Sequence, residues 1–235
     1  QKAARTALRR AGTTDPLSVD GALTLRQLEV VQAWWPEAPR AARGLRAATE
    51  LTLSPDSLHA TGSAEAAHLN LGAQAFDGLA LDYRLFGTLD GPLVETGTAN
   101  LGVRADTITT GERTLIEPTA TLTFANRRGT LKAQAHRFDA TGPFRVDTDL
   151  AIDPDQTVFT VQTLFAGMGE HEWRLSEPAT ITAYTDALIF DRLQLQSPRA
   201  GITTPQQLRI HGTLSEVPSD TLYVEAENVL VYPFS

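Results

Sequence analysis

The stretch EHEWRLSEPATITAYTDALIFDRLQLQS, residues 170–197, decides the fold. Its apolar residues occupy alternate positions, as at Trp173 and Leu175 and again at Leu193 and Leu195, with polar residues between them. A period of two is what a β-strand produces when one face is apolar and the other is polar. The stretch therefore predicts strands whose apolar side chains share one face, and it raises the question of what that face contacts.

The same alternation continues along most of the chain, from about Gly44 onward. Leu79 and Leu81, for example, alternate with Ala80 and Asp82. The apolar face that we predict in this way comprises Leu79, Leu81, Tyr83, Leu85, Leu101, Val103, Leu122, Phe124, Leu131, Phe144, Val146, Leu150, Phe159, Val161, Trp173, Leu175, Ile181, Leu193, Leu195, Leu208, Ile210, Leu222 and Val224.

The links between these strands are rich in Gly, Pro, Asp and Ser, and none is long enough for a crossover helix. Parallel neighbours need such a crossover, so the sequence predicts an antiparallel meander. The short link NRRG, residues 126–129, predicts a tight hairpin turn between two strands. The expected fold class is therefore all-β, with one short helix near the N-terminus.

Residues 1–43 differ from the rest of the chain. The first twelve residues, QKAARTALRRAG, are basic and are interpreted as a frayed arm. From Leu23 to Trp35 the apolar spacing suits a helix, which Pro36 and Pro39 would end. We therefore expect a basic arm and short helix over residues 1–43 and a repetitive β region over residues 44–235. Because the chain opens without a Met or a signal peptide, we expect an internal piece of a longer protein.

The composition argues against several classes of function. The net charge of −8 and the pI near 5.1 argue against a surface that binds nucleic-acid phosphates. The chain has no Cys, which excludes disulfides, thiolate metal sites and a Cys nucleophile. No apolar run approaches the ~18–20 residues that a membrane-spanning helix needs.

The sequence contains no motif that points to catalysis, a metal or a cofactor. Its five histidines are scattered, without an i, i+4 pair, and are interpreted as solvated side chains on strands. The acidic run DTDLAIDPDQT, residues 147–157, lacks the Gly and the Glu of a calcium loop. No phosphate-binding loop or nucleophile elbow occurs, and nothing singles out a carboxylate pair. We therefore expect no catalytic residue, no metal, no cofactor and no enzymatic activity.

The apolar face of such a sheet can be removed from water in two ways. Two sheets can pack face to face, although such a sandwich usually closes within ~100 residues. Alternatively, one long curled sheet can hold a guest, because continuous apolar surfaces above a few hundred Å² are rarely left to water. Acyl chains suit that role, since each CH₂ removed from water gains ~0.8 kcal/mol. Composition alone does not choose between the sandwich and the open groove.

Four runs of the chain resemble the TamB group of AsmA-like proteins. They are LEVVQAWWPEAPRAARGLRAATELTLS (28–54), WRLSEPATIT (173–182), LIFDRLQLQSPRAGI (188–202) and LRIHGTL (208–214). The likeness covers roughly residues 25–235 and consists of alternation punctuated by Trp, Pro and Gly. It implies a β-taco, a long curled antiparallel sheet that forms a U-shaped apolar groove, lined here by the apolar face defined above.

The resemblance also implies a function. Family members are bridges in the periplasm of a Gram-negative-type envelope that conduct phospholipid between inner and outer membranes. The expected ligands are therefore phospholipid acyl chains, with no nucleic acid. The expected partners, contacted through missing parts of the chain, are an outer-membrane β-barrel and an inner-membrane anchor. The alternatives are an assembly factor for outer-membrane β-barrel proteins and a structural or adhesive β-repeat protein with a sealed core.

Overall fold

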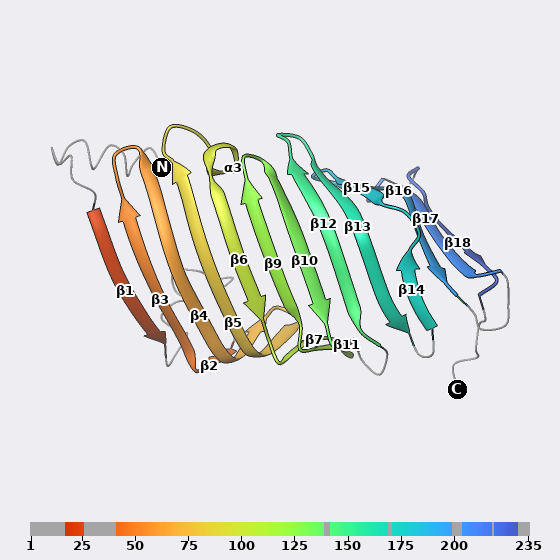
Figure 1. Cartoon of the computed structure of the whole chain (residues 1–235), viewed down its shortest axis with the longest axis horizontal. Coiled ribbons are helices and arrows are strands. Elements are labelled where there is room, and N and C mark those ends of the chain that lie inside the picture. Colours follow the sequence, from red (N-terminus) through yellow and green to blue (C-terminus); the bar gives the residue numbers. More distant parts are fainter. Residues whose placement is uncertain are drawn as a thin grey trace. The chain divides into compact units, whose positions relative to one another are not determined.

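The structure, a computed structural model, describes residues 17–25, 41–138, 142–168, 171–198, 204–217 and 219–229. The chain divides into two compact units, residues 1–129 and residues 130–235, which we call unit 1 and unit 2. The described residues of each unit lie mainly in β-strands (Figure 1).

The strands of unit 1 are β1 (Leu17–Leu25), β2 (Ala41–Arg43), β3 (Leu45–Leu53), β4 (Ser57–Leu71), β5 (Gln74–Thr88), β6 (Thr98–Arg104), β7 (Thr107–Thr110), β8 (Arg113–Ile116) and β9 (Thr119–Ala125). A short helix, α3 (Leu93–Thr96), lies between β5 and β6. The strands that follow are β10 (Arg128–Ala135), β11 (Arg137–Phe138), β12 (Phe144–Ile152), β13 (Thr157–Met168), β14 (His171–Leu175), β15 (Ala179–Ala183), β16 (Ala187–Ser197), β17 (Gln206–Ser215) and β18 (Leu222–Glu227).

Unit 1 is an antiparallel sheet in which β1, β3, β4, β5, β6 and β9 lie side by side in that order (Figure 1). The short strands extend the same ladders at one end: β2 pairs with β4, β7 pairs with β5, and β8 pairs with β7. Every described strand of unit 1 therefore belongs to one set of hydrogen-bonded ladders.

Unit 2 is also antiparallel. Strand β12 pairs with β10 and with β13, and β13 then pairs with β14 over one half and with β15 over the other. Strands β14 and β15 both pair with β16, which is followed by β17 and β18. The predicted fold class, all-β with antiparallel strands, is confirmed.

The N-terminal region departs from the prediction. Residues 23–25, the first turn of the expected helix, belong to strand β1. β1 pairs along its whole length with β3, so the predicted division at residue 43 falls inside a continuous sheet. The partner that fixes the register of β1 is β3, which begins at Leu45, twenty residues after β1 ends. The spacing of apolar residues along the sequence does not reveal so distant a partner. The rest of the predicted helix, residues 26–35, and the basic arm, residues 1–12, lie outside the described residues.

The turn predicted at NRRG is confirmed. Strand β9 ends at Ala125 and β10 begins at Arg128, which leaves a two-residue turn. The two residues, Asn126 and Arg127, have φ angles of 50° and 66°. A two-residue turn of this kind requires positive φ at both positions, and asparagine is among the residues that accept it at the first.

A row of five residues crosses unit 1 where the strands change direction. Gly44, Ala67, Gly78, Asp106 and Glu117 lie opposite one another, because the registers on either side of the row are continuous. Three of them have left-handed φ angles: Gly44 at 64°, Gly78 at 60° and Glu117 at 50°. Kinks aligned across neighbouring strands bend a sheet. We call this row the corner.

The pattern of buried residues shifts at the corner. In β4 the buried residues Ala66 and Leu69 are three positions apart, although a regular strand buries every second residue. Leu69 lies opposite Phe76, and Phe76 lies opposite Ile108, so the shifted row continues across three strands. Left-handed residues within strands re-aim the side chains that follow them. Strict alternation therefore fails at the corner.

Gly78→Ala is expected to destabilise the protein. A Cβ at Gly78 would lie 2.2 Å from an Asp106 carboxylate oxygen, and its φ of +60° disfavours any L side chain by ~1–2 kcal/mol. The melting temperature should fall by roughly 3–8 °C in calorimetry. Gly102→Ala is the matched control, because a Cβ there meets nothing within 4 Å. Equal melting temperatures for the two variants would contradict the corner's role.

Candidate functional site

The registers of unit 1 bring a set of apolar side chains onto one face of the sheet, which we call the unit-1 apolar face. By register it comprises Leu45, Ala47, Thr49, Leu51 and Leu53 of β3, Leu58, Ala60, Gly62, Ala64 and Ala66 of β4, Leu79, Leu81, Tyr83 and Leu85 of β5, Ala99, Leu101 and Val103 of β6, and Ala120, Leu122 and Phe124 of β9. None of these residues is charged.

The unit-1 apolar face is only partly covered. Only Ala60 and Ala66 are buried, whereas Leu101, Leu122 and the other large side chains are half-buried and Leu85 is 39% exposed. Every described strand of unit 1 lies within the same ladders, so the described part of unit 1 contains no separate sheet packed on this face. Large apolar side chains left half-exposed side by side mark a surface that is available for a ligand or partner.

Two hydroxyl groups are the only polar side-chain groups on this face, and they bind each other. Tyr83, Gly62 and Thr49 lie opposite one another on β5, β4 and β3. The Tyr83 ring reaches across Gly62, and its hydroxyl lies 2.6 Å from Thr49 Oγ1. A Cβ at Gly62 would lie 2.5 Å from the Tyr83 hydroxyl and 2.4 Å from the Ala48 carbonyl oxygen. Only glycine leaves room for this bridge.

Unit 2 also has an apolar face by register, the unit-2 apolar face. Its members are Phe144, Val146, Thr148, Leu150 and Ile152 of β12, Phe159, Val161, Leu164 and Ala166 of β13, Trp173 and Leu175 of β14, Ala179, Ile181 and Ala183 of β15, Leu188, Phe190, Leu193, Leu195 and Ser197 of β16, Gln206, Leu208, Ile210, Gly212 and Leu214 of β17, and Leu222, Val224 and Ala226 of β18. The β12–β13 pairing and the β16–β17 pairing each contain one register shift, and the residues named above remain on one face on both sides of each shift.

The centre of the unit-2 apolar face is closed. Trp173 is 8% exposed, Leu193 8% and Leu195 7%, whereas Leu214 and Val224 toward the outer strands are 50% and 59% exposed. We call Trp173, Leu193 and Leu195 the closed strip. Side chains buried to this degree are packed like a protein core, where little volume is left for a guest.

Two polar side chains adjoin the closed strip. Ser197 and Gln206 lie opposite each other on β16 and β17 and are 0% and 2% exposed. Among the described residues, neither Ser197 Oγ nor Gln206 Nε2 has a hydrogen-bond partner. A buried donor without a partner costs ~1–3 kcal/mol of folding free energy. Burial at this end of the face is therefore less favourable for folding than burial of the closed strip beside it.

The structure places the predicted apolar residues as follows. Those from Leu79 to Phe124 share the unit-1 apolar face, and those from Phe144 to Val224 share the unit-2 apolar face. Leu131 of β10 alternates with Lys132, whose ammonium nitrogen lies 3.5 Å from Asp147 Oδ2 on the polar side of the sheet. Alternation therefore puts Leu131 on the apolar side.

Sequence patterns missed part of both faces. Residues of β3 and β4 join the unit-1 apolar face. The small members (Ala47, Ala60, Gly62, Ala64 and Ala66) carry a weak hydrophobic signal, whereas Leu45, Leu51, Leu53 and Leu58 were missed although they are large. Beyond the corner, the residues missed because the alternation shifts are Leu69, Phe76, Ile108 and Leu115. In unit 2 the missed apolar residues include Leu164, Phe190 and Leu214.

Two histidines are more than solvated side chains. His68 Nδ1 lies 2.6 Å from Asp77 Oδ1, and Thr107 donates a hydrogen bond of 3.1 Å to Asp77 Oδ2. These bonds, first from His68 and then from Thr107, hold the pKa of Asp77 below its usual value. His211 stacks on Tyr223 with ring centroids 5.1 Å apart. Both histidines lie on strands and are partly exposed, and each has in addition a partner on the neighbouring strand.

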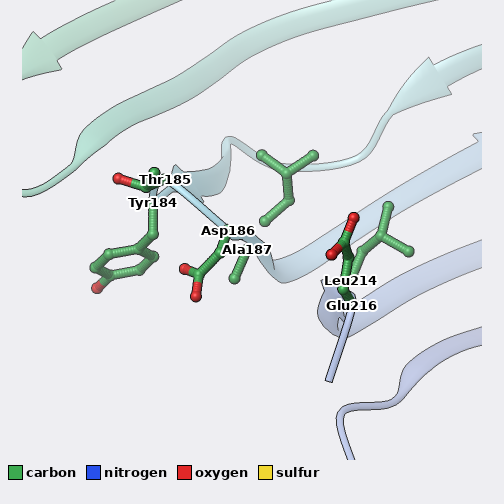
Figure 2. Close-up of a pocket in the computed structure, with 7 residues that line it drawn as sticks. Tyr184, Thr185, Asp186, Ala187, Leu214 and Glu216 are labelled. Carbon is green, nitrogen blue, oxygen red and sulfur yellow. The ribbon is translucent and has the colours of Figure 1, made fainter. Parts of the chain in front are cut away.

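Two surface hollows occur among the described residues. One, of about 530 Å³, lies in unit 1, and its lining includes Asp82, Arg84 and Asn100 of the polar face as well as Tyr83, Leu101 and Leu122. The other, of about 370 Å³, lies in unit 2 beside the β15–β16 turn. Figure 2 shows its lining, with Asp186 on the turn and Glu216 just after β17.

Over the residues that the structure describes, no group of His, Asp and Glu side chains is arranged to hold a metal ion. No helix within those same ranges is long and apolar enough to cross a membrane. Comparisons with protein-family models, with curated proteins and with solved structures gave no match.

Proposed function

We propose that this chain is a lipid-binding segment of a bridge-like lipid transfer protein, in which phospholipid acyl chains lie on an apolar β-sheet face as they pass between two membranes. In this proposal the protein catalyses no reaction and lies in the periplasm. The single observation that carries it is the unit-1 apolar face, which spans five strands without a charged residue and remains half-exposed.

The chemistry of that face favours hydrocarbon as the ligand. Its side chains are almost entirely aliphatic, and the two hydroxyls on it are bonded to each other. A ligand with several charged or polar groups would lose water there without gaining partners, which costs free energy for each group. An acyl chain has no polar groups to remove from water, and each CH₂ that is covered contributes ~0.8 kcal/mol to binding.

A second function, a structural β-repeat protein with a sealed core, is favoured by the closed strip of unit 2. Trp173, Leu193 and Leu195 are buried as in an ordinary core. The two functions differ in what they require of unit 1. A structural protein would leave its half-exposed apolar face empty or cover it with another protein, whereas a lipid carrier would hold lipid there.

The chain purified without detergent should retain phospholipid, which mass spectrometry of an organic extract would identify. After delipidation it should take up a phospholipid with a fluorescent acyl chain from vesicles. Bovine serum albumin, which binds fatty acids, and a β-sandwich without an open face serve as positive and negative controls. A chain that carries no phospholipid and takes up none would refute the proposed function.

A further inference from the structure

The bridge between Tyr83 and Thr49 is the one place where the unit-1 apolar face offers a polar group. The two hydroxyls bring two O–H protons, and the 2.6 Å contact between them uses one. Among the described residues, neither hydroxyl makes a second hydrogen bond. One O–H proton of the pair is therefore left to donate.

The pair lies within reach of a ligand on the face. Tyr83 is half-buried, and the bridge crosses Gly62 in the middle of β4, where no side chain stands in front of it. Its neighbours on the face, Leu101 and Ala64, offer no side-chain acceptor. In the free protein, water can accept the remaining proton because the face is open.

A ligand that covers the face removes that water. An all-hydrocarbon ligand would leave the remaining O–H without an acceptor, and an unsatisfied donor in an apolar contact is unfavourable. A ligand that carries an acceptor oxygen among its apolar groups avoids this loss. Ester carbonyl groups at the head of acyl chains are acceptors of this kind.

We propose that the Tyr83–Thr49 hydroxyl pair donates a hydrogen bond to the ester carbonyl oxygen of an acyl chain lying on the unit-1 apolar face. This inference rests on the proposed function, because it names the contact that a bound lipid makes. It makes ester-linked lipids better ligands than ether-linked lipids, whose linking oxygen is a poorer acceptor.

The test compares two phosphatidylcholines with identical head groups and chain lengths, one with ester and one with ether linkages, as competitors of a fluorescent phospholipid. The wild-type chain should prefer the diester about fivefold, which is the value of one ordinary hydrogen bond. The double variant Tyr83→Phe with Thr49→Val should bind both lipids equally, because it removes both hydroxyls and keeps the shapes of the side chains.

The single variants are not sufficient, since each leaves one hydroxyl that can still donate. Thr121→Val, on the opposite face of the same sheet, is the matched control and should keep the fivefold preference. A double variant that keeps the preference overturns the inference. Equal binding of the diester and the diether by the wild-type chain also overturns the inference. This result does not depend on the folding of any variant, and it leaves the proposed function intact. Failure to bind either lipid would refute the proposed function itself.

Discussion

Leu195→Asp is expected to unfold unit 2. Leu195 is 7% exposed in the closed strip and lies opposite Leu175 and Leu208 on the neighbouring strands. Truncating a buried leucine costs ~2–5 kcal/mol, and an unpaired carboxylate in its place adds several more. A protein of this kind has ~5–15 kcal/mol of stability in total, so little soluble folded material should remain.

The measurement is the yield of soluble protein together with thermal unfolding followed by circular dichroism. Surviving protein should melt at least about 10 °C below wild type. Gln196→Asp is the control: it adds the same charge one residue along, on the other face and opposite Arg174, and should melt near wild type. A normal melting temperature for Leu195→Asp would mean that the strip is open to water and that unit 2 also has room for a guest.

Leu101→Asp is expected to abolish lipid uptake while the fold survives. Leu101 is half-buried at the middle of the unit-1 apolar face, between Tyr83 and Leu122. Because the face is open, the carboxylate can remain hydrated, so the loss of stability should be about 1–2 kcal/mol, far less than at Leu195. An acyl chain laid over it would have to strip that water, which costs several kcal/mol.

Uptake of a fluorescent phospholipid should therefore fall at least about tenfold, with a melting temperature within roughly 5 °C of wild type. Asn100→Asp is the matched control, since it adds the same charge one residue earlier, on the polar face and opposite Arg84. Its uptake should equal that of wild type. If Leu101→Asp instead unfolds the chain, the unit-1 apolar face is a sealed core and the structural alternative gains support.

Alternation in the sequence was enough to identify most of the strands and the side of the sheet that each apolar residue occupies. In β5 the pattern from Leu79 to Leu85 assigned every apolar residue to the correct face, because successive side chains of a strand point to opposite sides whatever their neighbours are. The pattern failed at the corner, where the alternation shifts, so it did not identify Leu69 and Phe76 as members of one row. It also failed at β1, whose strand pairing depends on a distant partner.

The sequence by itself determined that the chain is all-β and that one face of its strands is apolar. Only the tertiary structure decided which part of that face is partly exposed and which is closed: Leu101 and Leu195 occupy equivalent places in the alternation, yet Leu101 is partly exposed and Leu195 is 7% exposed. The Tyr83–Thr49 bridge likewise joins residues 34 positions apart. The physical reason is that alternation is set within each strand by backbone geometry, whereas burial and side-chain contacts depend on how distant strands curve and pair.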